Sequence, residues 1–220
     1  MRDFIRRVLN VFYVRPCVVC GRPVKVVDNI NLCSRCTTTV DRYGQTINTS
    51  GRITISVLPH KKFVRRAMNR FKFSNKKYYG FTFAKLIHQR LRTCEWYGNI
   101  ECVVCVPMGK RNRLYNQSAV IARQVAERIG VPFAENAMVK VKDNPPFYKL
   151  TRAERLRAVK GAFDISHDLS FVGKRVLLID DIYTTGATSS ECRRVLLLNG
   201  AAEVYCATVC YAPLKERKLK

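Results

Sequence analysis

The sequence predicts an α/β protein, a mostly parallel sheet with flanking helices, preceded by a small cysteine-rich unit at the N-terminus. Apolar runs of strand length alternate with segments of helical periodicity from residue 53 to residue 211. Apolar residues make up 47% of the 220 residues, which is enough for a full core. Two C-x-x-C pairs, Cys17 with Cys20 and Cys33 with Cys36, precede this alternation.

The first 14 residues have the apolar periodicity of an amphipathic helix. Its apolar face is formed by Phe4, Ile5, Val8, Leu9 and Phe12, while Arg2, Arg6 and Arg7 lie elsewhere. This face either packs against the rest of the protein or rests on an anionic membrane surface. No apolar run approaches the roughly 20 residues needed to cross a bilayer, and the segment has no small-residue cleavage site. We expect a cytoplasmic protein, with association to a membrane surface left open.

Cys17, Cys20, Cys33 and Cys36 form two pairs separated by twelve residues, a spacing typical of a four-thiolate zinc ribbon. Four thiolates close the coordination sphere, so the zinc would be structural and would hold together a segment too small to fold alone. Two redox-active pairs or an iron–sulfur site remain as alternatives. We therefore divide the chain into residues 1–44, with the N-terminal helix and the ribbon, and a main domain of residues 45–220.

Beyond the cysteine pairs, strands and helices alternate. In chain order we expect a strand at 53–58, a helix with the apolar face Phe83, Leu86, Ile87 and Leu91, a strand at 101–108, a helix at 116–129 ended by Gly130, an extended segment at 131–141, a strand at 174–180, a helix at 188–199 ended by Gly200, and a strand at 204–211. Cys102 and Cys105 also have C-x-x-C spacing, but in a strand they point to opposite faces and should not bind one metal together. Repeated strand–helix–strand units predict a sheet whose ligands bind beyond the carboxyl ends of its strands, at residues 107–117 and 180–188.

The charge is distributed unevenly along the chain. Forty basic and sixteen acidic residues give a formal net charge of +24, an excess that calls for a polyanionic partner. Residues 42–94 contain thirteen basic and no acidic residues. Within the basic segment, residues 52–92, the candidate nucleic-acid contacts are Lys61, Lys62, Arg65, Arg66, Arg70, Lys72, Lys76 and Lys77. Interleaved aromatic rings could stack the bases of a single strand. The alternative is a solvated amphipathic helix, and we expect Phe71 and Phe73 to face the core.

Residues 176–188 read VLLIDDIYTTGAT, an apolar strand followed by two carboxylates and a small hydroxyl-rich turn that enters a helix. The backbone N–H groups of the turn, the threonine hydroxyls and the helix N-terminus can bind one phosphate monoester. Gly186 lets the backbone approach the ligand closely, and Asp180 and Asp181 can accept hydrogen bonds from the 2- and 3-hydroxyls of a ribose. The alternative is an ordinary capped helix, which does not need two adjacent acids followed by T-T-G-x-T.

These thirteen residues resemble the phosphoribosyl-pyrophosphate (PRPP) motif of type I phosphoribosyltransferases. Together with the cysteine pairs, they make the chain resemble the ComF family of competence proteins over nearly its whole length. Three further segments are similar to motifs of that family, namely Arg70-Phe71-Lys72-Phe73, Val106 to Gln117, and Leu150 to Phe163. The chain departs from the family at Leu114-Tyr115, where Gly-Phe is usual, and at Ala158, where Asn is usual.

The resemblance implies a type I phosphoribosyltransferase-like domain and a set of binding residues. The PRPP-binding residues would be Asp180, Asp181, Thr184, Thr185, Gly186, Ala187 and Thr188. The pyrophosphate-side loop would contain Pro107, Met108 and Gly109, with Arg111 or Arg113 as cations and Mg²⁺ bridging the pyrophosphate. A transferase would displace pyrophosphate at the anomeric carbon, which needs charge neutralisation of the leaving group and a positioned base. The residues identify no catalytic group and no acceptor, so the enzyme activity stays open.

Three functions are compatible with these motifs. The favoured one is a ComF-like factor that binds single-stranded DNA during natural transformation and carries a site for PRPP or a ribose 5-phosphate. A DNA-uptake motor or channel at the inner membrane face would be a further partner. The second is a nucleobase phosphoribosyltransferase of purine or pyrimidine salvage, and the third is a regulator that binds duplex DNA. The ribbon and the basic segment favour the first over the second, and no helix-turn-helix pattern precedes the pocket to support the third.

Overall fold

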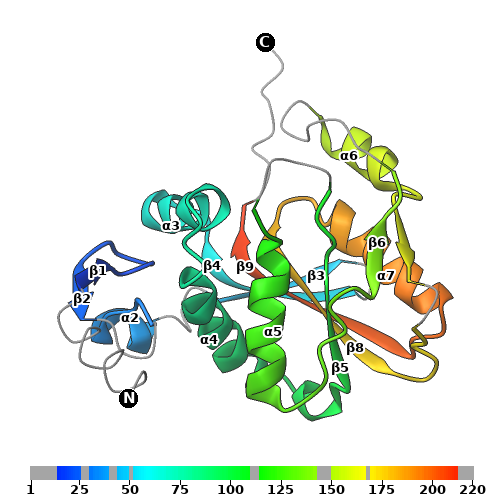
Figure 1. Cartoon of the computed structure of the whole chain (residues 1–220), viewed down its shortest axis with the longest axis horizontal. Helices are drawn as coiled ribbons and strands as arrows, with labels where there is room; N and C mark the ends of the chain where they lie inside the picture. The colour runs from blue at the N-terminus through cyan, green and yellow to red at the C-terminus, as the bar shows by residue number, and fades with distance from the viewer. Residues whose placement is uncertain are drawn as a thin grey trace.

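A computed structural model describes residues 14–25, 30–39, 44–49, 52–109, 114–142, 150–166 and 169–212. Its centre is a five-stranded sheet in the order β3-β4-β9-β8-β5 (Figure 1). These strands are β3 (Gln45–Thr49), β4 (Arg52–Pro59), β5 (Cys102–Cys105), β8 (Arg175–Tyr183) and β9 (Glu203–Tyr211). β3 pairs antiparallel with β4, and the remaining three pairs are parallel. The predicted α/β fold with a mostly parallel sheet is confirmed.

Side chains of the helices fill a hydrophobic cluster on each face of the sheet. One face is covered by α3 (Lys62–Phe73), α4 (Tyr79–Leu91) and α5 (Gln117–Ile129), and the other by α7 (Ala187–Leu198) with the antiparallel pair of β6 (Met138–Lys140) and β7 (Phe163–Ile165). Val103 and Cys105 belong to the first cluster, whereas Cys102 and Val104 belong to the second. This alternation confirms that Cys102 and Cys105 point to opposite faces of β5.

Most of the predicted elements form within a few residues of the expected bounds. The strands expected at 53–58, 174–180 and 204–211 are β4, β8 and β9, and the helices expected at 116–129 and 188–199 are α5 and α7. The strand expected at 101–108 is shorter, because β5 pairs with β8 only as far as Cys105. Of the extended segment at 131–141, only Met138–Lys140 is a strand. The elements without a counterpart among those expected from the sequence include β3, β7, the short 3₁₀ helix η2 (Tyr97–Asn99) and α6 (Arg152–Val159).

The ends of α5 show why this helix could be read from the sequence. The Asn116 side chain accepts hydrogen bonds from the backbone N–H groups of Ser118 and Ala119, at 3.0 and 3.4 Å. Gly130 ends the helix with a φ of 84°, a left-handed conformation that other residues rarely adopt. An N-cap side chain of this kind contributes about 1 kcal/mol to the stability of a helix.

The cysteine-rich unit packs against the main domain, beside α3 and α4 (Figure 1). It contains the antiparallel pair β1 (Val14–Pro16) and β2 (Pro23–Lys25) and the short helix α2 (Ser34–Thr39). Val18 is 1% exposed and belongs to the same cluster as the buried residues of α3 and α4. The backbone N–H of Asn31 donates to the Thr82 hydroxyl of α4 at 2.8 Å. The predicted N-terminal helix lies outside the described residues, and the domain boundary at residue 44 stays a prediction.

The basic segment contains the strand β4 and the helices α3 and α4. Phe71 of α3 is fully buried, as predicted, but Phe73 is 67% exposed, so the prediction that it faces the core is wrong. Residues two apart in a helix point in nearly opposite directions, so both rings cannot face the same core. Within the ranges that the structure describes, no helix has both the length and the apolar character that a membrane span requires.

Candidate functional site

Strand β8 ends in the two acids of the motif. Residues 176–179 are fully buried, which fixes the strand between β5 and β9. Asp180 and Asp181 follow at its carboxyl end and are partly buried. Because β5 and β8 are parallel, the loop after Cys105 leaves the sheet at the same edge as the acids. The Asn116 amide donates to the carbonyl of Val106 at 3.0 Å and so holds the start of that loop.

The turn between β8 and α7 is tightly built around Gly186. This residue has a φ of 73° and directly precedes the first turn of α7. A Cβ at this position would lie 2.5 Å from the Tyr183 hydroxyl oxygen, so the close approach and the left-handed backbone both require glycine. The Thr185 hydroxyl accepts a hydrogen bond from the backbone N–H of Ala187 at 3.3 Å. The turn therefore presents the N-terminus of α7 beside the two acids.

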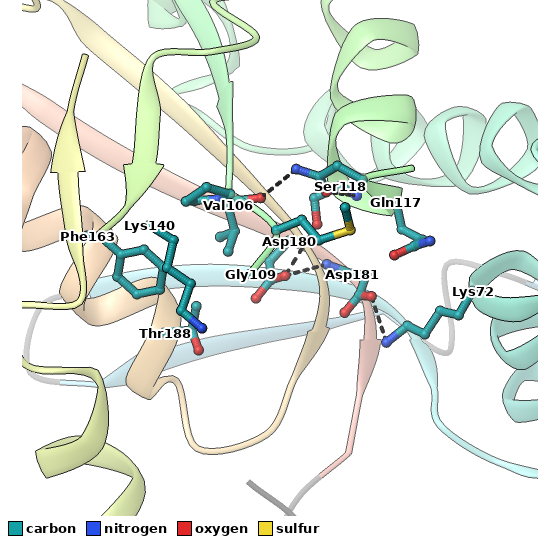
Figure 2. Close-up of a pocket in the computed structure, with 13 residues that line it drawn as sticks. Lys72, Val106, Gly109, Gln117, Ser118, Lys140, Phe163, Asp180, Asp181 and Thr188 are labelled. Carbon is teal, nitrogen blue, oxygen red and sulfur yellow. Dashed lines mark hydrogen bonds and ion pairs between the residues drawn. The ribbon is translucent and has the colours of Figure 1, made fainter. Parts of the chain in front are cut away.

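A cavity of about 160 Å³ lies at this edge of the sheet (Figure 2). Its lining includes six predicted site residues, namely Pro107, Met108, Gly109, Asp180, Asp181 and Thr188. Thr184, Thr185, Gly186 and Ala187 form the adjacent turn and are not among the lining residues. Arg111 and Arg113 lie outside the described residues. The structure thus brings the acid pair and the pyrophosphate-side loop, which are distant in sequence, to one cavity.

Two lysines that the sequence did not assign to this cavity also line it. Lys72 of α3, predicted as a nucleic-acid contact, forms an ion pair with Asp181, with 2.6 Å between Nζ and Oδ2 and both side chains 14% exposed. Lys140 lies close to Gly109, since a Cβ on Gly109 would be 2.9 Å from the lysine Nζ. Figure 2 shows the acids between these two lysines, which come from α3 and β6. The cavity therefore contains two carboxylates suited to hydroxyl groups, one of them paired with Lys72, and the Lys140 ammonium beside the Gly109 loop as a cation suited to a phosphate.

The two acids differ in their electrostatic environment. Burial, followed by the negative charge of Asp181, raises the pKa of Asp180 to about 7. The Asp181 backbone N–H, which donates to Asp180 Oδ1 at 2.8 Å, and the Ser118 hydroxyl at 3.4 Å act in the opposite direction. Near neutral pH the pair therefore holds a proton part of the time, and it can both donate to and accept from hydroxyl groups.

Arg155 is a buried cation beside the turn between β8 and α7. We call this turn, from Thr184 to Thr188, the phosphate-type turn. Its guanidinium donates to the Thr184 hydroxyl at 3.3 Å and to the carbonyl of Leu150 at 3.2 Å, and the residue is 7% exposed. A capping box between Thr151 and Glu154 starts α6 and places Arg155 within this helix. Arg155 is not among the site residues predicted from the sequence, although the T-x-x-E pattern just before it indicates the start of a helix.

The four cysteines of the two C-x-x-C pairs form one cluster. Their sulfur atoms all lie within 4.8 Å of one another, and the Sγ atoms of Cys20 and Cys33 are 3.7 Å apart. Tetrahedral zinc with thiolate bonds near 2.3 Å separates its ligands by about 3.8 Å, so the donor set and its spacing fit a metal ion. Gly21 follows the first pair with a φ of +76° and faces the Phe63 ring, where a Cβ would lie 2.4 Å from the ring carbons. The cluster thereby connects to the start of α3.

The remaining candidate cations of the basic segment point outward. The exposed ones are Lys61, Lys62, Arg65, Arg66, Arg70, Lys76 and Lys77. The Lys62 ammonium lies 5.5 Å and the Arg66 guanidinium 6.0 Å from the centre of the Phe63 ring. Tyr115, one of the positions where the chain departs from the ComF family, donates its hydroxyl to the carbonyl of Phe71 in α3. The Lys77 ammonium lies 5.1 Å from the centre of the Tyr115 ring. We call these seven outward cations the basic face.

The fold and the cavity together define a class of protein. An acid pair at the carboxyl end of a central parallel strand, followed by a small turn at a helix N-terminus, is the arrangement of a type I phosphoribosyltransferase domain. The family model described as phosphoribosyl transferase domain matches residues 81–220, and the chain belongs to this family.

Among curated proteins, the chain is similar to proteins named competence protein and DNA utilization protein. It is 28% identical over 144 residues to competence protein F of Haemophilus influenzae, covering 62% of this chain and 63% of that protein. It is 25% identical over 209 residues to DNA utilization protein YhgH of Salmonella typhi, covering 88% and 89%. It is 23% identical over 223 residues to competence protein ComFC of Streptococcus pneumoniae, covering 86% and 96%. The predicted resemblance to ComF proteins is confirmed.

Solved structures match at lower sequence identity. Glutamine PRPP amidotransferase from B. subtilis is 19% identical with a TM-score of 0.45, over 75% of this chain and 35% of that chain. A hypoxanthine phosphoribosyltransferase from Staphylococcus aureus is 18% identical with a TM-score of 0.40, over 66% and 72%.

Proposed function

We propose that this protein is a ComF-type factor of natural transformation that binds single-stranded DNA on its basic face and PRPP or a ribose 5-phosphate in its cavity. The observation that carries the proposal is that the cavity with its adjacent acids and the basic face occur together in one chain. The names of its relatives, competence protein and DNA utilization protein, point to the same process. A motor or channel for DNA uptake is the protein partner that this role implies.

The cavity is suited to a phosphorylated ribose. Asp180 and Asp181 would bind the ribose hydroxyls, and the turn from Thr184 to Thr188 would hold the 5-phosphate with backbone N–H groups at the start of α7. Carboxylate oxygens are also ligands that Mg²⁺ prefers, so the site fits a metal-bound pyrophosphate. On the pyrophosphate side, Lys140 would join the residues of the 107–109 loop, with Arg111 or Arg113 as further cations.

The basic face is suited to the backbone of a single strand. Its cations follow one helix and the loop after it, where no acidic residue interrupts them. Cations arranged in this way bind phosphates through counterion release, without dependence on base sequence. The exposed Phe73 ring offers an apolar surface on which a base could stack.

Zinc in the cysteine cluster would have a structural role. Four thiolates leave no open coordination position, so the metal would hold the two knuckles of the N-terminal unit, residues 1–44. Through Gly21 and Phe63 that unit would support the start of α3 and the basic face. The metal would therefore contribute to strand binding indirectly.

Salt-dependent titration of a fluorescent oligothymidylate tests the strand site. We expect Arg66→Gln with Arg70→Gln to reduce the slope of log affinity against log salt by about 1.4, since each phosphate contact of a single strand contributes about 0.7. The control exchanges two exposed cations elsewhere, Arg128→Gln with Lys174→Gln, and so removes the same net charge. Equal slopes for the two double variants would contradict a strand site on α3.

Calorimetric titration with PRPP and Mg²⁺ tests the cavity. We expect binding by the unaltered protein and a loss of binding in the double variant Asp180→Asn with Asp181→Asn, because these carboxylates would hold the ribose hydroxyls. Binding that is unchanged in this variant would place the ligand elsewhere. Release of pyrophosphate with an added nucleobase, without affinity for single strands, would instead indicate a salvage transferase.

A further inference from the structure

Lys72 is the point where the basic face meets the cavity. The seven cations of the basic face point outward, whereas the Lys72 side chain turns from the same helix toward β8. Figure 2 shows it reaching Asp181, with Nζ 2.6 Å from Oδ2. Both side chains are only 14% exposed, so water screens this ion pair less than it would at the surface.

The surroundings of Lys72 continue onto the exposed side of α3. Arg65 and Lys72 are two helical turns apart and therefore lie on a common face of the helix. Both also lie near His60, whose pKa is lowered first by burial and then by the charges of Lys72 and Arg65, while Asp181 acts in the opposite direction. His60 thus lies within electrostatic range of the exposed Arg65, of Lys72 and of Asp181.

We propose that Lys72 exchanges between Asp181 and a phosphate of a bound strand, so that strand binding opens the hydroxyl-binding side of the cavity. This inference rests on the proposed function, because it requires both ligands. In the free protein Lys72 occupies the Asp181 oxygen that a ribose hydroxyl or a ligand-borne cation would use. Single-stranded DNA bound along Arg65 offers Lys72 a phosphate as a second anionic partner. The long flexible side chain of lysine permits the exchange.

The exchange makes binding at the two sites cooperative. A ligand with a ribose diol must displace Lys72 from Asp181, which costs free energy. Single-stranded DNA that already binds Lys72 removes this cost. The coupling is reciprocal, so the ribose phosphate should tighten strand binding by the same factor. Breaking one charge-assisted contact of a largely buried pair corresponds to roughly a tenfold change in affinity.

The test is calorimetric titration with PRPP and with inorganic pyrophosphate, each with Mg²⁺, in the presence and absence of saturating oligothymidylate. The variants are Lys72→Met, which removes the charge at similar length, and Lys72→Arg, which retains it. Lys174→Met is the matched control, because this exposed lysine immediately precedes β8, at the end opposite the acid pair. Circular dichroism establishes that each variant is folded.

In the unaltered protein and in Lys174→Met, we expect the oligonucleotide to tighten PRPP binding about tenfold. We expect Lys72→Met to bind PRPP tightly without the strand and to show almost no response to it, while its affinity for pyrophosphate stays unchanged. Lys72→Arg should restore the response. Pyrophosphate is the comparison ligand because it has no ribose hydroxyls for Asp181 to bind, so its affinity should not depend on the Lys72–Asp181 ion pair.

Two results would overturn the inference alone. One is that both ligands bind to the unaltered protein but the strand leaves PRPP affinity unchanged, a measurement that needs no variant. The other is that Lys72→Met weakens PRPP and pyrophosphate alike, which would make Lys72 a direct contact of the anionic ligand. Failure of the unaltered protein to bind either ligand would overturn the proposed function and the inference together.

Discussion

Gly186→Ala tests whether the phosphate-type turn depends on the close approach between Gly186 and Tyr183. Two costs arise from the substitution. The left-handed backbone, with a φ of 73°, costs a residue with a Cβ roughly 1–2 kcal/mol. The new Cβ would also lie 2.5 Å from the Tyr183 hydroxyl oxygen and 2.8 Å from Cζ of the same ring. Tyr183 is buried and its ring packs 5.9 Å from that of Tyr211, so relief requires a shift that costs about 1–3 kcal/mol more.

Gly130→Ala is the matched control, because Gly130 has a φ of 84° but no atom within 4 Å of an added Cβ. Both variants are unfolded in urea with the metal content held constant. The difference between their free energies of unfolding then measures the cost of the close approach to Tyr183. We expect Gly130→Ala to lose about 1–2 kcal/mol and Gly186→Ala about 2–5 kcal/mol. Gly186→Ala should also lose PRPP affinity, since the turn would move. Equal losses of stability in the two variants would refute the reasoning.

Three further predictions concern the acid pair, the cysteine cluster and α6. Burial raises the pKa of Asp180 from its ordinary value to about 7, so the carboxyl group stabilises the fold below about pH 4 and this contribution is lost as the pH rises toward 7. Asp180→Asn should therefore gain stability relative to the unaltered protein by up to about 1.4 kcal/mol per pH unit over that range, measured by urea unfolding at several pH values; a difference independent of pH would contradict this. Removal of the metal with a strong chelator should release one zinc ion per cluster, accelerate hydrogen exchange in residues 14–39 and weaken strand binding, while PRPP binding persists; unchanged exchange would argue against a structural metal. Thr151→Ala should remove the half of the capping box that the threonine hydroxyl forms, the 3.3 Å bond that it accepts from the Glu154 backbone N–H, and accelerate hydrogen exchange in α6 by an amount corresponding to about 1 kcal/mol. Thr151→Ser is the control, and equal exchange in both variants would show that the cap contributes nothing.

Features that depend on residues adjacent in the chain could be predicted directly from the sequence. The apolar strand before Asp180, the small turn at Gly186 and the capped helix from Asn116 to Gly130 each depend on neighbours within a few positions. The two C-x-x-C pairs are local as well, and the structure brings their four sulfurs to one point. Phe73 shows the limit of such reading, because aromatic character predicted burial whereas its position on α3 leaves it exposed.

The cavity itself joins residues that are far apart in the chain. Lys72 carries the same charge as its neighbours in the basic segment, and only the packing of α3 beside β8 turns it toward Asp181. Lys140 reaches the loop at Gly109 because β6, paired antiparallel with β7, lies next to the sheet. Arg155 approaches Thr184 because α6 packs near the turn. None of these contacts has a signature in sequence spacing.

The sequence by itself determined the α/β class, the metal-type cysteine pairs, the acid pair with its turn, and the location of the excess charge, because each follows from local periodicity or from residue type. Only the tertiary structure decided which cations face outward and which enter the cavity. That choice depends on the order of the strands and the rotation of α3 against them, which set the direction of each side chain. Because of this geometry, Lys72 pairs with Asp181 in the cavity instead of pointing outward with the seven cations of the basic face.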